Sequence, residues 1–263
     1  MMKDPALQAS CETPDILISC ILDAGELLLS NGAEVLRVED TLSRICKAYG
    51  FTRVDVFSIT SSIVLTVHNA EGRILTQTRR ITSRDTNLQT VSHVNELSRQ
   101  LCKAPVSVPE FQRRLSWIRS AKTYPIAIQC FCYAMISAVF SVFFGGSAMD
   151  GLAAALSGVL MFFSLRFMQK LRINSILQSM LVSAITALAV VLLVHIGIGN
   201  TPEKITIGNI MLLIPGISFT TALRDIINGD TISGLVGISE AVIKAVAIAI
   251  GFATVLVQIG GIL

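Results

Sequence analysis

Two charged residues inside an apolar stretch near the C-terminus are the first candidates for chemistry. Glu240 and Lys244 stand four residues apart in "SGLVGISEAVIKAVAIAIGFATVLVQIGG", a spacing that places both side chains on one face of a helix, where they can pair. The same face continues with residues that are small or polar: Ala247, Gly251, Thr254 and Gln258. Because such a face is costly against lipid, we expect it beside other helices or a polar pathway. The alternative is that Lys244 extends to the cytoplasmic surface and Glu240 lies among lipid headgroups.

A helix breaker interrupts the preceding apolar stretch, "GNIMLLIPGISFTTALRDIINGD". Pro215 lacks a backbone N–H and Gly216 tolerates the resulting geometry, so the carbonyl groups freed by the break need protein or water as partners. Many transporters use broken helices to present backbone dipoles to a substrate near the middle of the membrane, although a structural kink would have the same sequence. If the helix continued, Asn209, Gly216 and Thr220 would share a face. The candidate substrate or ion pathway comprises Asn209, Pro215, Gly216, Thr220, Arg224, Asp225, Asp230, Glu240 and Lys244.

These residues belong to the apolar half of a chain with two different compositions. The chain has 263 residues, of which 52% are hydrophobic and only 15% charged. Soluble domains contain about a quarter of charged residues. Here the charges concentrate before residue 123, whereas residues 126–263 are nearly free of them. We therefore predict a soluble domain followed by a membrane domain.

The apolar half divides into five segments, most of them long enough to cross a bilayer as helices. A hydrocarbon core about 30 Å thick requires roughly 20 apolar residues. We predict spans at about 126–144, 148–165, 176–198, 205–223 and 235–259, of which the second is marginal in length. The predicted fold is a transmembrane domain of five helices at 126–263, preceded by a disordered N-terminus at 1–12, a cytoplasmic α/β domain at 13–104, and a linker with a juxtamembrane helix at 105–125.

Basic residues predict the orientation of these spans. They concentrate before the first span, between the second and third, and after the fourth: Arg113, Arg114, Arg119, Lys122, Arg166, Lys170, Arg172 and Arg224. The opposite loops contain Lys204 alone. Because Lys and Arg near span ends stay in the cytoplasm, we expect a multi-pass protein of the cytoplasmic (inner) membrane, with its N-terminus in the cytoplasm and its C-terminus outside. The first residues show no signal-peptide pattern, and the cysteines of the soluble part are expected to be free thiols.

The soluble part reads as mixed α/β. Apolar residues at spacings of three and four predict helices over 13–32, stopped at Asn31-Gly32, and over 33–50, ending at Gly50. β-Branched residues then predict three antiparallel strands over 52–60, 62–69 and 73–82, with a turn at "AEG" between the last two. Helical spacing returns over 87–101, and a further helix at 110–121 leads to the membrane.

The sequence shows no pattern of soluble catalysis. It contains no Gly-rich phosphate loop, HExxH pair or Ser/His arrangement, so we expect neither ATP-driven transport nor an enzyme, and no cofactor or metal. The three histidines are scattered singly. Charged residues of the second helix, such as Glu34, Arg37, Glu39 and Asp40, are most simply a solvated face. No basic patch indicates a nucleic-acid partner.

Three segments carry a resemblance to a known family: "NGAEVLRVEDTLSRICKAYGF", "SSIVLTV" and "LLIPGISFTTALRDIINGDTISG". They resemble the threonine/serine exporter family, and more closely the shorter YjjP-like subunits of its split transporters. In the cytoplasmic domain the motif covers Gly32, Ala33, Glu34 and Arg37; in the membrane domain it covers Pro215, Gly216, Arg224, Asp225, Gly229 and Asp230.

The resemblance implies proton-motive-force-driven export of small polar metabolites, either threonine and serine or small dicarboxylates such as succinate. It also implies a second small membrane subunit that supplies the hydrophobic half missing here. A homo-oligomer would serve the same purpose, since a pathway needs helices around it. The alternative function is a membrane-anchored module whose cytoplasmic domain senses a ligand, without transport activity.

Overall fold

The computed structural model describes residues 14–121, 124–171 and 173–259 of the chain. The predicted disordered segment 1–12 lies outside these residues. The chain divides into two compact units. One lies within the ranges 1–122 and 217–238, and the other within 123–216 and 239–263. The first unit therefore combines the N-terminal domain with a segment from the apolar half of the sequence.

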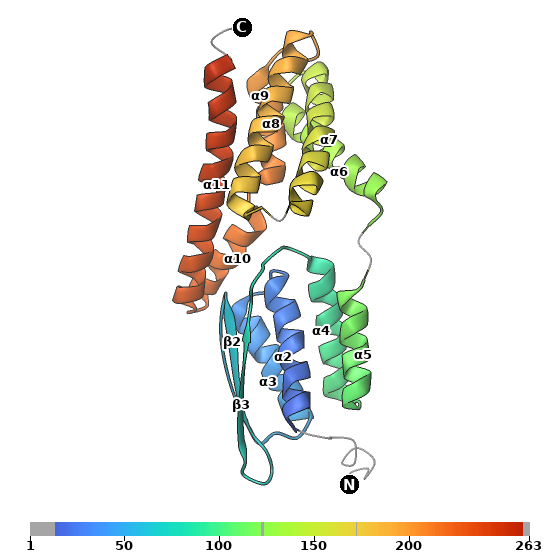
Figure 1. The fold of residues 1–263 in the computed structure, drawn as a ribbon, viewed down its shortest axis with the longest axis vertical. Coiled ribbons are helices and arrows are strands. Elements are labelled where there is room, and N and C mark those ends of the chain that lie inside the picture. The colour runs from blue at the N-terminus through green and yellow to red at the C-terminus, as the bar shows by residue number, and fades with distance from the viewer. Residues whose placement is uncertain (1–13, 122–123, 172, 260–263) are drawn as a thin grey trace. The chain divides into compact units, whose positions relative to one another are not determined.

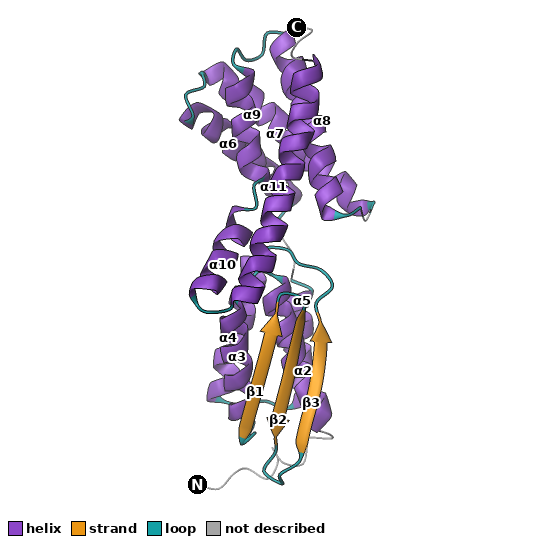
Figure 2. Cartoon of the chain, turned by 90° about the vertical axis from the view of Figure 1, so that its left-hand side faces the viewer, coloured by secondary structure: helices purple, strands orange, loops and turns teal. Residues whose placement is uncertain are grey.

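A three-stranded antiparallel sheet forms one layer of the first unit (Figure 2). Its strands β1 (Arg53–Ile59), β2 (Ser62–His68) and β3 (Ile74–Arg80) are neighbours in chain order, as the three β-branched stretches predict. Inward-facing residues alternate along β2, where Ile63, Leu65 and Val67 are fully buried. The other face of the sheet is largely solvent-accessible, which is common in antiparallel sheets.

Four helices complete the N-terminal domain: α2 (Pro14–Ser30), α3 (Val35–Ala48), α4 (Leu88–Lys103) and α5 (Val108–Arg119). Helices α2 and α3 cover one face of the sheet, and α4 and α5 pack on their far side (Figure 1). Helix α2 therefore lies in the middle layer. Its buried residues surround the helix: Leu17, Ile18, Cys20, Ile21, Leu22, Ala24, Gly25, Leu27, Leu28 and Leu29. These residues cover most of the circumference of α2, and the remaining strip is polar, with Ser19, Asp23 and Glu26 at spacings of four and three.

Helix α5 belongs to the core of this unit. The sequence predicts a linker and a juxtamembrane helix over 105–125, but the apolar face of α5 is buried through Phe111, Leu115 and Ile118. These residues are four and three apart, so they lie on one helical face. Pro109 lies in the first turn of the helix, where the missing N–H costs nothing.

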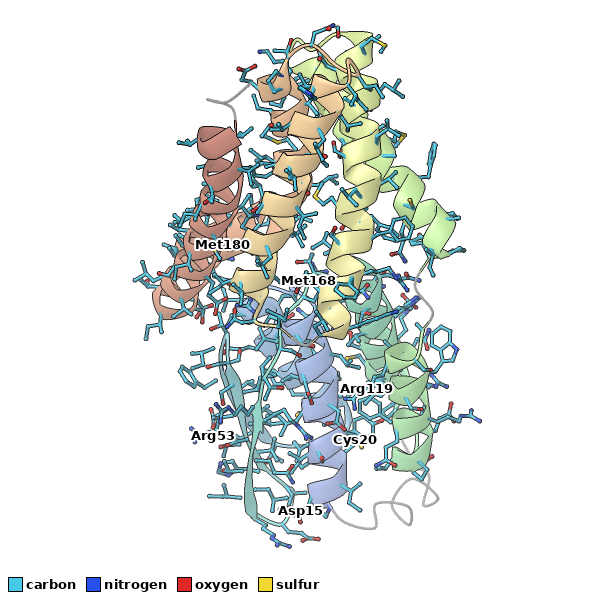
Figure 3. All side chains as sticks on the ribbon, turned by 45° about the horizontal axis from the view of Figure 1, so that its top comes forward. Asp15, Cys20, Arg53, Arg119, Met168 and Met180 are labelled. Atoms are coloured by element: carbon cyan, nitrogen blue, oxygen red, sulfur yellow. The ribbon has the colours of Figure 1, made fainter. Side chains whose placement is uncertain are left out.

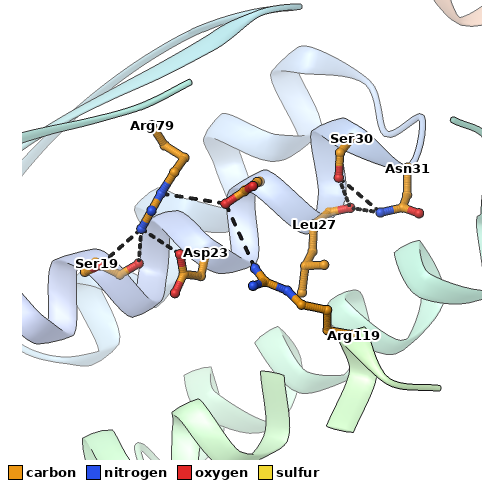
Figure 4. A network of polar contacts seen from close by, with 8 residues as sticks. Ser19, Asp23, Leu27, Ser30, Asn31, Arg79 and Arg119 are labelled. Atoms are coloured by element: carbon orange, nitrogen blue, oxygen red, sulfur yellow. Dashed lines mark hydrogen bonds and ion pairs between the residues drawn. The ribbon is translucent and has the colours of Figure 1, made fainter. Parts of the chain in front are cut away.

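Arg79 joins the sheet to the helical layers (Figure 4). Its Nη2 atom lies 2.6 Å from Asp23 Oδ1 and 3.1 Å from Ser19 Oγ, both on α2. Its Nε atom lies 3.7 Å from Glu26 Oε2, which Arg119 of α5 also approaches at 4.0 Å. One arginine and one shared carboxylate thus connect β3, α2 and α5. Because these side chains are about one-third exposed or more, each pair contributes no more than about 1 kcal/mol.

Among the described residues, four helices are long and apolar enough to cross a membrane. They are α6 (Ile126–Phe143), α7 (Ala148–Lys170), α8 (Ser175–His195) and α11 (Thr231–Ile259). Helices α9 (Pro202–Leu213) and α10 (Gly216–Ile227) meet the same criterion only as a bent pair, which raises the number to five. Helix α7 extends to Lys170, beyond the predicted end at 165, and α11 begins at Thr231 instead of residue 235.

The predicted fourth span, 205–223, is not one continuous helix. Helix α9 ends at Leu213, and Ile214 adopts an extended conformation with φ −58° and ψ 128°. This is the conformation that a following proline imposes, because the pyrrolidine ring disfavours helical geometry in the residue before it. The chain then resumes as α10 after Pro215. The break therefore separates two helices instead of bending one.

Small residues allow the helices of the second unit to approach closely. A Cβ atom on Gly208 of α9 would lie 2.4 Å from the carbonyl oxygen of Ser137 on α6. On α11, a Cβ atom at Gly251 would lie 2.3 Å from the carbonyl oxygen of Met180, which is labelled on α8 in Figure 3. Both distances are far shorter than real Cβ contacts. These glycines are therefore sites of close helix packing, as expected for membrane helices.

Candidate functional site

The two sequence motifs of this protein meet inside the first unit. The Oδ1 atom of Asp225, near the end of α10, accepts a hydrogen bond from the backbone N–H of Val35 at 3.3 Å. Val35 is the first residue of α3, and Glu34, which precedes it, makes no side-chain capping bond of its own. The first N–H groups of a helix have no partner within that helix. Asp225 therefore caps α3 from a position 190 residues away in the sequence.

A second contact joins the neighbouring residues. The Nη1 atom of Arg224 donates a hydrogen bond to Glu34 Oε1 and forms an ion pair with it. The side chain of Glu34 is 21% exposed, whereas that of Arg224 is 63% exposed. The pair Glu34–Val35 thus faces the pair Arg224–Asp225 through one ion pair and one helix cap. We call these four residues the α3–α10 junction.

The residues before Glu34 set its direction. Gly32 has φ +91°, a left-handed conformation that side chains rarely adopt, and it follows the end of α2 as a terminating residue. Ala33 is buried and donates its N–H to the carbonyl oxygen of Leu28 at 3.0 Å. The motif glycine and alanine therefore form the turn between α2 and α3. They hold Glu34 in place, and neither presents a functional group.

Asp230 lies in the turn between α10 and α11. Gly229, with φ +100°, ends α10 in a left-handed conformation, and the Asp230 N–H donates to the carbonyl oxygen of Asp225 at 2.9 Å. The Oδ2 atom of Asp230 is buried, and it has no hydrogen-bond partner within the described part of the chain. This carboxylate is one of the charged groups that act on Asp225, together with Glu34 and Arg84. Asp225 itself is only 3% exposed.

Charged residues of α3 do not form a single solvated face. Glu39 accepts hydrogen bonds from Ser58 of β1, at 2.6 Å from its N–H and 3.0 Å from its hydroxyl. It therefore occupies the edge of the sheet. Asp40 pairs with Arg44 one turn along the helix at the surface. Arg37 is exposed, and we find no ion pair of its guanidinium within the described residues. The expectation of a solvated face is thus wrong for Glu34 and Glu39.

Asn209 lies in a polar cluster in the second unit. Its side chain is fully buried, donates to Ser157 Oγ at 2.7 Å, and accepts from Ser137 Oγ at 3.1 Å. A further hydrogen bond runs to the carbonyl oxygen of Ile205 at 3.0 Å. The cluster joins α6, α7 and α9, and its hydrogen bonds are made within the chain. In this structure Asn209 stabilises helix packing, and its assignment to a pathway stays a prediction.

The residues after the break differ from Asn209 in exposure. Gly216 has open space around its Cα, and Thr220 is exposed, with its hydroxyl donating to the carbonyl oxygen of Ile217 at 2.9 Å. Because the helix is interrupted at Pro215, these residues do not continue the face on which Asn209 lies. The prediction that Asn209, Gly216 and Thr220 share a face applied only if the helix continued through Pro215.

Glu240 and Lys244 lie on the outer part of α11. Glu240 is exposed and Lys244 is half-buried. The side of α11 that packs in the second unit is small or apolar and includes Ala247, Ile248 and Phe252. The predicted polar face is therefore divided: its small residues are buried, and Glu240 remains accessible to lipid, water or a second protein.

Sequence reasoning missed the role of Asp150. This residue is only 1% exposed, and Oδ1 accepts from the backbone N–H groups of Asn200 at 2.6 Å and Thr201 at 2.9 Å. Its Oδ2 atom accepts from the N–H and the hydroxyl of Ser147, each at 2.8 Å, which completes a capping box at the start of α7. Asp150 thus links the starts of α7 and α9. The Ser-x-x-Asp spacing was a signal for the first of these roles.

The described residues include no group of three or more His, Cys, Asp or Glu side chains that could hold a metal ion. The junction offers carboxylates and guanidinium groups for polar recognition, and it has no arrangement of nucleophile and base.

Comparisons with known proteins identify the family. Residues 19–259 match the model of the family described as "Putative threonine/serine exporter". The chain is 24% identical over 243 residues to the "Probable succinate transporter subunit YjjP" of Escherichia coli (strain K12), covering 88% of this chain and 90% of that protein. It is 23% identical over 243 residues to the protein of the same name from Klebsiella aerogenes, covering 90% of each. No solved structure shows significant similarity. Since the family model spans most of its residues, the chain belongs to the threonine/serine exporter family of membrane transporters.

Proposed function

We propose that this chain is one subunit of a secondary transporter that exports small polar metabolites, driven by the proton-motive force. Membership of the exporter family and the presence of four or five candidate spans support a membrane transporter. The observation that carries the proposal is the α3–α10 junction. It ties the cytoplasmic domain to the helix that follows the break, so the two motifs act as one structure.

The lengths of α9 and α10 support a fourth crossing that includes the break. Helix α9 rises about 18 Å and the first eight residues of α10 about 12 Å, at about 1.5 Å per residue. Together they match a hydrocarbon core about 30 Å thick, which neither helix spans alone. Arg224 follows these residues and contacts the N-terminal domain. We therefore place this domain and the end of α10 on the cytoplasmic side, with five spans and the C-terminus outside.

The exposed part of α11 supports a second membrane subunit. Glu240 is a carboxylate on a helix that otherwise has the composition of a membrane span. The side chain is exposed on this part of α11, which leaves the surface accessible to a second protein. The relatives in Escherichia coli and Klebsiella aerogenes are named as transporter subunits. We infer that a small membrane partner, or a second copy of this chain, covers this part of α11 and completes the polar pathway.

The proposed substrate class rests on the names of the family and its relatives and on the charged side chains of the candidate site. The family description refers to threonine and serine, and the relatives' names refer to succinate. All three are small and carry at least one carboxylate. Arginine side chains such as Arg224 bind carboxylates well, and carboxylates such as Asp230 bind ammonium groups. We propose that the pathway takes such metabolites.

The test is flux in proteoliposomes that contain this chain with a candidate partner or alone. Labelled threonine, serine and succinate are loaded inside, and efflux is measured with and without a proton gradient. We expect gradient-dependent efflux of at least one substrate, and Glu240→Gln should reduce it severalfold. The matched control is Glu203→Gln, which neutralises an exposed acid in the first turn of α9. If no substrate moves with any partner, the transport proposal is wrong.

One observation favours the alternative of a ligand-sensing module. A hollow of about 260 Å³ lies between α3 and α4, and its lining includes Arg44, Arg99 and Lys103. Arg44 and Arg99 are already paired with Asp40 and Glu96, so little positive charge remains for an anionic ligand. The transport proposal is therefore preferred. Unchanged flux in an Arg44→Ala, Lys103→Ala variant would leave the hollow without a role in transport.

A further inference from the structure

We propose that the α3–α10 junction is a latch, which holds α10 on the cytoplasmic domain in one state of the transport cycle and releases it in another. The inference rests on the proposed transport function and adds a moving element to it. It is drawn from three features of α10: how the helix is held, where the backbone can bend at its ends, and what moves with it.

Helix α10 is held mainly by polar contacts. In this helix, which is described in full, Ala222 and Asp225 are the buried residues. Its large apolar side chains are exposed, among them Ile217 at 50% and Ile227 at 76%. Apolar burial stabilises a contact by about 25 cal/mol per Å² and is not easily reversed. Hydrogen bonds and ion pairs exchange with water at a small net cost. A contact of this second kind can open and close repeatedly.

The backbone can bend at both ends of α10. Pro215 breaks the helix on one side, and Gly216 beside it has no neighbouring atom within 4 Å of a Cβ position. On the other side Gly229 has φ +100°, which ends the helix in a turn. Hinges in proteins are a few residues at the ends of elements that absorb changes in φ and ψ. Helix α10 is thus a short rigid body between two such positions.

The start of α11 would move with α10. A Cβ atom on Gly234 would lie 2.7 Å from the carbonyl oxygen of Ala222, and one on Gly237 would lie 2.7 Å from the Ala222 Cβ. The two helices therefore pack in direct backbone contact on either side of the turn at Gly229. Glu240 follows on the same helix, within a turn of Gly237. Opening the latch would shift the segment that carries this acidic residue.

The experiment locks the junction with a reversible cross-link. Glu34 and Arg224 are both replaced by cysteine in a chain whose other accessible cysteines are replaced by serine, and the pair is bridged with a bifunctional thiol reagent that a reductant cleaves. Flux is measured in proteoliposomes before bridging, after bridging, and after reduction. The control is the cysteine pair Asp40→Cys, Arg44→Cys, which the same reagent bridges within α3 alone. We expect bridging at 34 and 224 to lower flux roughly tenfold or more, reduction to restore it, and the control to transport throughout.

A second measurement tests the contact without transport. Amide hydrogen exchange is followed at Val35 and over 217–227 in Glu34→Arg, in Arg224→Glu, and in the double variant that reverses both charges. We expect each single variant to speed exchange severalfold, because like charges then face each other, and the double variant to restore slow exchange. The exposed pair Arg53–Asp55 of β1, reversed in the same way, is the control.

The outcomes separate the latch from the transport function. If the bridged protein transports as fast as the unbridged one, the junction is static and the latch is wrong. Equal exchange in all charge variants would also overturn it, because the contact would not be holding α10. If even the unbridged wild-type chain moves no substrate, the proposed function fails, and the exchange data then describe a contact without a transport role.

Discussion

The Oδ1 atom of Asp225 lies 3.3 Å from the backbone nitrogen of Val35, although 190 positions separate the two residues in the sequence. A helix N-cap is usually the residue directly before the helix, and Ser, Thr, Asp and Asn are preferred there. Glu34 occupies that position in α3 without making the capping bond. A carboxylate from α10 supplies the missing acceptor. The stability of α3 and the position of α10 are therefore linked through one hydrogen bond.

The first prediction concerns this cap. Asp225→Ala leaves the Val35 N–H without its acceptor, and loss of a cap costs about 1 kcal/mol, within a range of roughly 0.5–2. Asp225→Asn keeps an acceptor oxygen and should cost less. Denaturant unfolding in detergent checks this. The fluorescence of Trp117 on α5, the sole tryptophan of the chain, monitors the transition. Asp55→Ala at the exposed surface of β1 is the control. Equal midpoints for Asp225→Ala and the wild type would contradict the prediction.

The second prediction concerns close packing of the membrane helices. Gly208→Ala would place a Cβ atom 2.4 Å from the Ser137 carbonyl oxygen, so α6 and α9 must move apart. Overpacking of this kind typically costs about 1–3 kcal/mol. Gly216→Ala is the matched control, because nothing lies within 4 Å of its Cβ position. Thermal unfolding in detergent should show a lower midpoint for Gly208→Ala alone. Equal unfolding midpoints for both variants and the wild type would contradict the close packing of α6 and α9 at Gly208.

The third prediction concerns Asp150. Asp150→Ala removes the acceptor of the N–H groups of Asn200 and Thr201 and also breaks the capping box with Ser147. Two helix starts lose a cap, at about 1 kcal/mol each, so we expect about 2 kcal/mol of destabilisation. Thermal unfolding measures it. Variant protein that is still folded should keep its substrate flux, because the carboxylate is engaged in packing. A normal midpoint with lost flux would instead place Asp150 in the pathway.

The fourth prediction concerns thiol reactivity and sidedness. Burial raises the pKa of the Cys46 thiol to about 12, so this thiol stays protonated and unreactive at neutral pH. Cys102 is exposed. A membrane-impermeant maleimide should label Cys102 in inside-out vesicles and not in right-side-out vesicles, with Cys11 and the half-buried Cys130 and Cys132 replaced by serine. Cys46 should react only after unfolding. Labelling of Cys102 from the outside would reverse the proposed topology.

The rate of maleimide labelling should depend on pH for Cys102 and not for Cys46. Raising the pH from 7 to 9 increases the thiolate fraction of Cys102 and should speed its labelling; burial raises the pKa of this thiol, and the nearby charge of Arg44 acts in the opposite direction. Cys46 should not respond over this range. Because its pKa in the folded chain lies above the ordinary value of 9.0, its contribution to the unfolding free energy is complete below pH 9 and is lost as the pH rises towards 12.

Local signals in the sequence predict most elements of the N-terminal domain. Asn31-Gly32 and Gly50 end the first two helices, and the three β-branched stretches form the sheet, because these signals act within a few residues. The packing of α5 was not predicted. Its apolar positions are compatible with either a membrane surface or a protein core, and only the presence of α2 and α4 beside it decides between them.

In the candidate site, too, some features can be predicted from the sequence and others are visible only in the structure. Arg224 and Asp225 can be singled out in the sequence because charges beside apolar stretches are unusual, and Glu34 is marked by the family resemblance alone. Their contact cannot, because no local interaction joins residues 190 positions apart. Asn209 shows the reverse case. A polar residue in an apolar helix suggests a pathway, and the structure surrounds it with two serines that satisfy it within the helix packing.

The sequence by itself determined that an apolar, span-forming half follows a charged α/β half, and that a break or a kink interrupts the helix at Pro215. Hydropathy, helix period and proline geometry are properties of neighbouring residues, so no fold is needed to read them. Only the tertiary structure decided that α10 belongs with the N-terminal domain, that Asp225 caps α3, and that Asp150 joins two helix starts. Each of these depends on which backbone N–H group lies opposite the carboxylate once the chain has folded. The two partners of each hydrogen bond are far apart in the sequence, so no local pattern predicts the contact.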